Sequence, residues 1–124
     1  MRHNLVRLLT LACAVGALWL AGCREPIDLP DELFGTYTTT DHAYADRHFS
    51  LSPLRVTLGL GEGREAEHPI KAIYGELDRG HLLYTVVYET AFGEDSLVFY
   101  AEGGANVELV LKNRPDIRWQ REES

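Results

Sequence analysis

Several segments between residues 34 and 121 alternate apolar and polar residues with a period of two. The segment 54–60 reads Leu-Arg-Val-Thr-Leu-Gly-Leu, and the segment 107–112 reads Val-Glu-Leu-Val-Leu-Lys. Because successive side chains of a β-strand point to opposite faces, this period gives each segment one apolar face for a core and one polar face for water. The pattern predicts half-buried strands rather than amphipathic helices.

Eight such segments follow one another, and short turns that contain glycine separate most of them. The turns at 78–80 and 102–105 are of the hairpin kind, whereas a looser loop is expected to start at 59–63. Since short connections join antiparallel neighbours, we expect the strands to follow one another in the sheet as a meander. The expected strands are Gly35–Asp41, Arg47–Ser52, Leu54–Leu60, Pro69–Leu77, His81–Thr90, Asp95–Ala101, Asn106–Leu111 and Asp116–Arg121.

A meander of about eight strands has two edge strands with unpaired backbone groups unless the sheet closes or is covered. We therefore predict an all-β fold, a small single-domain antiparallel meander that forms a closed or partly closed barrel. A β-sandwich is the alternative. The strand at 81–90 is apolar on both faces, which indicates that it is central or faces two packed layers. The residues expected in the core are Leu58, Ile70, Tyr84, Val86, Phe99, Leu109 and Trp119.

Two short motifs have counterparts in a known family. Gly35-Thr36-Tyr37 follows a short polar segment and resembles the Gly-x-Trp motif of lipocalins, and the segment 117–121 supplies an aromatic residue and an arginine near the end of the chain. Tyrosine stands where lipocalins have tryptophan, the chain is shorter, and no closing helix is evident. The domain is therefore lipocalin-like in architecture at most, and the resemblance implies a barrel.

The first 22 residues have the layout of a secretory signal. Arg2 and Arg7 supply a basic start, an uncharged stretch runs from residue 8 to residue 22, and small residues precede Cys23. The uncharged stretch has fifteen residues, which is fewer than the about 20 that a membrane-spanning helix needs. We interpret residues 1–22 as an export signal that is removed.

Leu20-Ala21-Gly22-Cys23 resembles the lipobox of bacterial lipoproteins. The resemblance implies cleavage before Cys23, a diacylglycerol on its thiol and a further acyl chain such as palmitate on its amine, and several chains anchor a protein more firmly than one. Arg24 stands where aspartate tends to retain enterobacterial lipoproteins in the inner membrane. The resemblance therefore favours the outer membrane of the bacterial cell envelope, facing the periplasm. The expected division is a signal peptide at 1–22, a lipidated cysteine and tether at 23–33, a β domain at 34–121 and a tail at 122–124.

The mature chain is expected to be strongly acidic and to have no free thiol. Loss of residues 1–22 takes two of the twelve lysines and arginines and none of the nineteen acids, which leaves a net charge of −9. This charge disfavours nucleic acid and anionic membranes and favours a basic-surfaced envelope protein as partner. Cys13 is lost with the signal and Cys23 would be acylated, so we expect neither a disulfide nor a thiolate metal site.

The densest group of possible metal ligands lies between residues 41 and 48. Imidazole and carboxylate together suit zinc, but the spacing matches no known site. We interpret the segment as a polar turn in which Arg47 pairs with a nearby acid, and we predict no metal and no cofactor. The residues of this group are Asp41, His42, Asp46 and His48.

The residues that could catalyse a reaction do not form a recognised arrangement. Ser50, Ser52 and Ser96 lack the glycine-flanked elbow of a hydrolase nucleophile. Glu65 and Glu67 are typical of solvated charge rather than of a paired acid and base. We therefore predict that the protein is not an enzyme.

Aromatic residues on most of the expected strands leave two interpretations open. They could fill an ordinary core, or they could line a cavity for a small amphipathic ligand. The candidate ligand-binding residues are Tyr37, Tyr84, Tyr88 and Trp119. We predict a lipid-anchored envelope protein that acts as a non-catalytic binding or scaffolding module. A small-molecule or lipid carrier is the alternative, and a hydrolase comes third.

Overall fold

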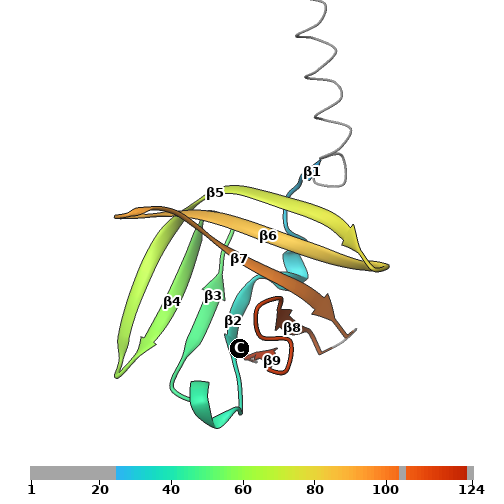
Figure 1. Cartoon of the computed structure of the whole chain (residues 1–124). Coiled ribbons are helices and arrows are strands. Elements are labelled where there is room, and N and C mark those ends of the chain that lie inside the picture. Colours follow the sequence, from blue (N-terminus) through green and yellow to red (C-terminus); the bar gives the residue numbers. More distant parts are fainter. Residues whose placement is uncertain (1–24, 104–105, 123–124) are drawn as a thin grey trace, which may run out of the picture.

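The computed structural model describes residues 25–103 and 106–122 (Figure 1). Two short 3-10 turns, η1 (Asp31–Leu33) and η2 (His42–Tyr44), are the helical elements of this part of the chain. The fold is therefore all-β, as predicted. The strands are β1 (Glu25–Pro26), β2 (Gly35–Thr38), β3 (His48–Leu51), β4 (Arg55–Gly61), β5 (Arg64–Asp78), β6 (His81–Thr90), β7 (Gly93–Glu102), β8 (Glu108–Leu111) and β9 (Arg118–Arg121).

Strands β2 to β9 form a closed antiparallel barrel in which each strand pairs with its neighbours along the chain. The last strand returns to the first, with Tyr37 opposite Arg121 and Thr38 opposite Gln120. β1 is a ninth strand, which pairs with β5. The predicted barrel is confirmed. A sandwich is excluded because all eight strands of the meander lie in one continuous sheet.

β5 is the longest strand and contributes to two parts of the barrel wall. Its residues up to Pro69 pair with β4, and its residues from Ile70 onward pair with β6. Pro69 has no backbone N–H to donate, so a position where the pairing changes suits it. In Figure 1, β5 bends at the upper left and then runs beside β6. The later part of β5 thus has a second edge, along which β1 lies.

The turn between β4 and β5 is a tight hairpin, not the looser loop that we expected. Its two residues, Glu62 and Gly63, have φ values of 57° and 75°, as in the two-residue turns that suit twisted strands. β5 therefore begins at Arg64, five residues before the expected start at Pro69. The residues 65–68 are Glu-Ala-Glu-His, so they lack the apolar alternation that would have indicated a strand.

Residues 25–33, which we expected to belong to a semi-extended tether, are part of the folded domain. Their first two residues form β1, and Leu29 and Leu33 are each only 4 % exposed. Pro26 and Pro30 disfavour α-helix in this segment. The expectation of a tether outside the domain is wrong for this range, because Leu29 and Leu33 lie in the core, where burial of each contributes about 1.5–3 kcal/mol.

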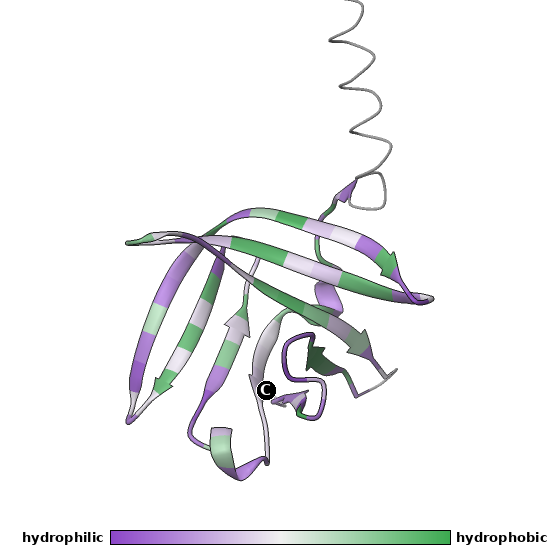
Figure 2. Ribbon diagram, in the orientation of Figure 1, coloured by the Kyte–Doolittle hydropathy of each residue, from purple (hydrophilic) through white to green (hydrophobic). Residues whose placement is uncertain are grey.

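The core lies inside the barrel. Figure 2 shows hydrophobic and hydrophilic residues alternating along strands such as β4, as expected of strands with one face toward a core. Tyr37 and Phe99 are fully buried. Among the predicted core residues, Leu58 and Ile70 are half-buried and pack against this core. The other five predicted core residues are buried: Tyr84, Val86, Phe99, Leu109 and Trp119.

Candidate functional site

Residues 27–34, called the plug below, close the end of the barrel at which the described chain begins. Leu29 and Leu33 of the plug belong to the buried core. The Tyr37 hydroxyl donates a hydrogen bond to the Leu33 carbonyl at 2.8 Å, and the Arg121 guanidinium donates one to the Glu32 carbonyl. Two of the residues that hold the plug, Tyr37 and Arg121, thus belong to the lipocalin-like motifs.

Ile27 at the start of the plug lies directly against Gly75 of β5. A Cβ atom on Gly75 would approach Ile27 Cδ1 to 2.8 Å, closer than non-bonded carbon atoms pack. The Ile27 N–H also donates to the Ile73 carbonyl at 3.0 Å. Glycine at position 75 therefore allows the incoming chain to lie close to the barrel wall.

An apolar groove of about 450 Å³ opens beside the plug, between the incoming chain and the end of the β5–β6 hairpin. Its floor includes Ile27, Leu77, Leu82 and Tyr84. Leu77 and Leu82 are cross-strand partners, yet they are 73 % and 44 % exposed. Complete burial of such a side chain contributes about 1.5–3 kcal/mol. A group that covered these two leucines would therefore bind favourably.

The leucines of the groove continue the inward face of the barrel. Gly75 pairs with Tyr84, and the next pair on the same face is Leu77 with Leu82. Tyr84 is in the core, stacked on Phe99 with ring centroids 5.6 Å apart. The groove is therefore the part of the barrel mouth that the plug does not fill.

Three carboxylate side chains belong to residues at the rim of this groove: Glu25, Asp28 and Glu76. Among the described residues that line it, none is basic. Burial raises the pKa of the Tyr84 hydroxyl, and Glu32 raises it further, so this hydroxyl stays protonated at neutral pH. The groove thus offers an apolar floor, a neutral phenol and an acidic rim.

The four predicted ligand-binding residues do not surround one space. Tyr84 lines the groove, whereas Tyr37 stacks on Phe49 with centroids 5.2 Å apart. Tyr88 stacks on His68 at 5.3 Å. These contacts are typical of core packing for Tyr37 and Tyr88.

Trp119 is the fourth of these residues, and it lies between two aromatic rings. Its ring centroid is 5.2 Å from that of Phe49 and 6.2 Å from that of Tyr44. The indole Nε1 is buried and has no hydrogen-bond partner in the described part of the chain. Trp119 therefore packs as a core residue with one unsatisfied donor.

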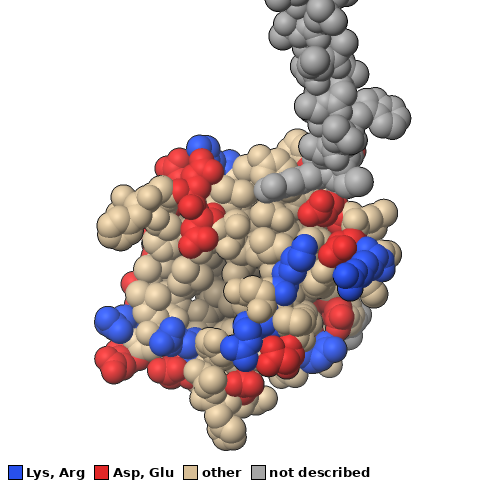
Figure 3. Space-filling view, viewed as in Figure 1, with Lys and Arg blue, Asp and Glu red and all other residues tan. Residues whose placement is uncertain are grey.

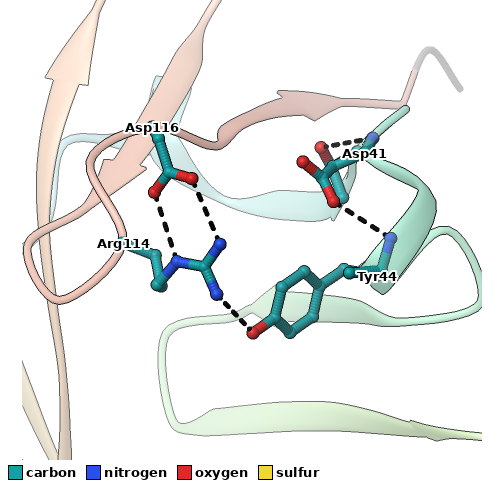
Figure 4. Close-up of polar contacts among 6 residues, drawn as sticks. Asp41, Tyr44, Arg114 and Asp116 are labelled. Carbon is teal, nitrogen blue, oxygen red and sulfur yellow. Dashed lines mark hydrogen bonds and ion pairs between the residues drawn. The ribbon is translucent and has the colours of Figure 1, made fainter.

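The opposite end of the barrel carries a polar cluster instead of an apolar plug (Figure 4). Arg114 donates to both carboxylate oxygens of Asp116, at 3.2 Å and 3.1 Å, and to the Tyr44 hydroxyl at 3.0 Å. The guanidinium also lies 5.4 Å from the centre of the Tyr44 ring. The cluster connects the loop after β8 with the loop after β2, and the Tyr44 ring contacts Trp119 below it.

The group that we weighed as metal ligands is engaged in local contacts. The Asp41 carboxylate accepts a hydrogen bond from the Ala43 N–H and caps η2. Asp46 lies 3.7 Å from the Arg47 guanidinium, which confirms the predicted pairing of Arg47 with a nearby acid. His48 Nε2 contacts Glu65 at 3.1 Å across the sheet. No cluster of three metal-ligating side chains occurs among the residues that the structure describes.

A second, polar hollow of about 370 Å³ lies on the outer face of β2 and β3. His48 and Glu65 line it, together with Ser50, whose hydroxyl is hydrogen-bonded to Thr36 at 2.8 Å. Glu67 lies beside Arg55 at 3.2 Å, so the two glutamates face different partners. In the view of Figure 3, charged side chains gather around the margin of the molecule and uncharged residues occupy its middle.

Sequence reasoning missed the groove and the plug that bounds it. Three apolar residues in the segment that we interpreted as a tether could have indicated the plug. They are Ile27, Leu29 and Leu33. The predicted lipidation site, Cys23, lies outside the described residues, as does the signal peptide. In the described part of the chain no helix has the length and apolar character to cross a membrane. Comparisons with protein-family models, curated proteins and solved structures give no match for this chain.

Proposed function

We propose that the mature protein is a lipid-anchored domain of the bacterial cell envelope that binds a partner rather than catalysing a reaction. The lipobox-like residues 20–23 support the anchor, and Arg24 favours the outer membrane, on its periplasmic side. β1 begins two residues after Cys23, so the anchor would join the barrel almost directly. Intact-mass measurement of the membrane-extracted protein tests this, because Cys23→Ser should abolish both acylation and membrane association.

The observation that carries the binding proposal is Phe92, which is 101 % exposed at the tip of the β6–β7 hairpin. By the up-and-down order of the strands this hairpin lies at the end opposite the plug, and Figure 1 shows the β6–β7 and β5–β6 hairpins on opposite sides. Exposed aromatic residues are frequent anchors of protein interfaces. A partner that approaches from the side away from the membrane would meet Phe92.

The surroundings of Phe92 favour a basic-surfaced partner. Glu89, Glu94 and Asp95 flank the tip and are exposed, and Lys71 is the cation that contacts the two glutamates. Three carboxylates against one ammonium leave the hairpin acidic, in agreement with the net charge of the mature chain. Charges at the rim of an interface mainly govern the rate of encounter, so association should slow as salt rises.

A photo-crosslinking residue at position 92, tested in intact cells, examines this proposal. We expect it to capture a specific envelope protein, whereas the same residue at Leu54, which is 76 % exposed in the β3–β4 turn, should not. Phe92→Ala should reduce affinity for the captured protein without lowering the melting temperature. Equal capture from both positions, or none from position 92, would argue against a binding surface at this hairpin.

The groove favours a second candidate function, a small-molecule or lipid carrier. Its volume of about 450 Å³ falls in the range of ligand pockets, about 300–1,000 Å³. A ligand would occupy the barrel mouth, because side chains such as Tyr37 and Phe99 fill the interior. Mass spectrometry of the protein purified without detergent exchange would identify a co-purifying molecule.

A further inference from the structure

The pairing of β1 with β5 has a register that can be extended upstream. Glu25 pairs with Gly75, and Pro26 pairs with Tyr74. In an antiparallel pair each step back along one strand is a step forward along the other. A strand continued in this register would bring Arg24 opposite Glu76 and Cys23 opposite Leu77. Opposite charges at facing positions stabilise strand pairs, so the sequence suits this extension.

The same register determines the face on which residue 23 would lie. Facing residues of two paired strands project from the same side of the sheet, and the side alternates from residue to residue. Leu77 shares the inward face of Gly75 and forms part of the groove floor. The side chain at position 23 would therefore project over the groove, beside Leu77 and Leu82.

We infer that the groove holds the sulfur-linked diacylglyceryl group of Cys23, an inference that rests on the proposed lipidation and deepens it. The glyceryl esters and first methylenes of this group would cover Leu77 and Leu82, and the remaining acyl chain would continue into the bilayer. The barrel mouth then faces the membrane, and the Phe92 hairpin faces away from it. A lipid held in the groove would thus fix the orientation of the domain on the membrane.

Two observations favour the diacylglyceryl group of Cys23 over a free lipid or ligand as the occupant of the groove. Residue 23 is two residues from Glu25, and a chain spans at most about 3.3–3.6 Å per residue, so the anchor cannot move far from the groove. A tethered group is present at high effective concentration. The diacylglyceryl group is also uncharged, whereas the carboxylates of Glu25, Asp28 and Glu76 at the rim would repel an anionic headgroup.

The orientation can be measured on the lipidated protein in phosphatidylcholine vesicles that contain brominated lipid as a quencher. A fluorophore is attached through Arg79→Cys, at the β5–β6 turn, or through Phe92→Cys as the matched control at the opposite end. We expect strong quenching and a blue-shifted emission at position 79, and neither at position 92. Leu77→Ser combined with Leu82→Ser should reduce the quenching at position 79, and because both leucines are exposed the melting temperature should not fall.

Equal quenching at positions 79 and 92, or quenching at 79 that the two serine substitutions leave unchanged, would overturn the inference. The register has its own test: Arg24→Cys with Glu76→Cys should form a disulfide on mild oxidation, because facing Cα atoms lie about 4.5–5.5 Å apart. Arg24→Cys with Glu65→Cys is the control and should stay reduced. Failure of the first pair also overturns the inference. An intact mass without lipid on Cys23 would instead refute the proposed function.

Discussion

At the barrel end where the chain enters, Leu29 and Leu33 fill the interior. At the opposite end Arg114 forms an ion pair with Asp116. Arg114 also bonds the Tyr44 hydroxyl, and the Tyr44 ring contacts Trp119. The first closure removes apolar surface from water, which contributes about 25 cal/mol per Å². The second is an ion pair whose side chains are 45 % and 65 % exposed, and such pairs contribute little to stability. Substitutions in the plug should therefore lower the free energy of unfolding strongly, whereas substitutions in the polar cluster at the opposite end should change it little.

The comparison also separates two apolar features of the surface, the groove and Phe92. The groove lies at the plug end, between the plug and the β5–β6 ladder that contains Leu77 and Leu82. Phe92 lies at the tip of a hairpin that extends beyond the opposite end. A site that includes paired strands holds a group more precisely than a site on a loop, whereas an exposed tip suits a partner that approaches from solution.

The largest effect is expected at Trp119, which lies beneath the polar cluster and inside the core. Trp119→Ala should lower the free energy of unfolding by about 3–5 kcal/mol, a large part of the about 5–15 kcal/mol typical of a domain. Chemical denaturation measures this loss. Trp119→Phe should cost clearly less, because it also removes an N–H that is buried without a partner and such a group carries a penalty of its own.

A Trp119→Ala variant that unfolds at the wild-type denaturant concentration would contradict the barrel closure. It would mean that β9 does not contribute to the core, although Leu109 of β8 pairs with Trp119.

The next largest effect is expected in the plug. Leu33→Ala should destabilise the fold by about 2–5 kcal/mol because Leu33 is buried in the core and the truncation leaves a cavity. Leu54→Ala is the matched control, since Leu54 is 76 % exposed and should change stability by no more than about 0.5 kcal/mol. Equal melting temperatures for the two variants would show that the plug is an appendage of the barrel, as a tether would be.

The barrel could be predicted from the sequence because its evidence is local. The alternation in β4 and β6 and the two-residue turn at 79–80 are properties of short segments, and the period of two fixes which residues face inward. β6 was expected at 81–90 and is found there. The early part of β5 was missed because Glu65, Ala66, Glu67 and His68 contain no large apolar residue.

The plug and the groove could not be predicted because they depend on contacts between distant segments. Leu33 lies in the core, and residues far along the chain fix this position: Tyr37 bonds the Leu33 carbonyl, and Arg121 bonds the carbonyl of Glu32. Leu77 and Leu82 have the alternation of ordinary core residues, and their exposure arises because the plug stops short of them. The alternation along one strand does not show whether a distant segment covers the apolar residues of that strand.

A smaller effect is expected from the hydrogen bond that ties the plug to the barrel. Tyr37→Phe removes the donor to the Leu33 carbonyl and should cost about 1 kcal/mol. Burial raises the pKa of Tyr37, against a weaker opposing effect of Arg121. Since the neutral phenol is favoured in the folded state, this stability is fully present below about pH 10, the pKa of an unfolded-state tyrosine, and is lost as pH rises through the higher folded pKa.

Denaturation of the wild type and Tyr37→Phe at a series of pH values measures this dependence. The difference between the two proteins should be constant from neutral pH to about pH 10 and should shrink above it. A difference that stays the same in strong alkali would mean that the Tyr37 hydroxyl is not isolated from solvent by the plug.

The smallest effect is expected at the polar cluster of the opposite end. Asp116→Asn removes the charge that pairs with Arg114, and its effect on the melting temperature should be smaller than that of Tyr37→Phe and should shrink in high salt. The hydrogen bonds from Arg114 lower the pKa of Asp116, so the contribution of the pair is present above the ordinary carboxyl pKa and is lost as pH falls through the lowered one. Thermal melting at low and high salt, at neutral and at strongly acidic pH, measures both dependences. A fall in melting temperature as large as that of Leu33→Ala, and insensitive to salt, would contradict the comparison. It would mean that the exposed ion pair stabilises its end of the barrel as much as the apolar plug stabilises the other.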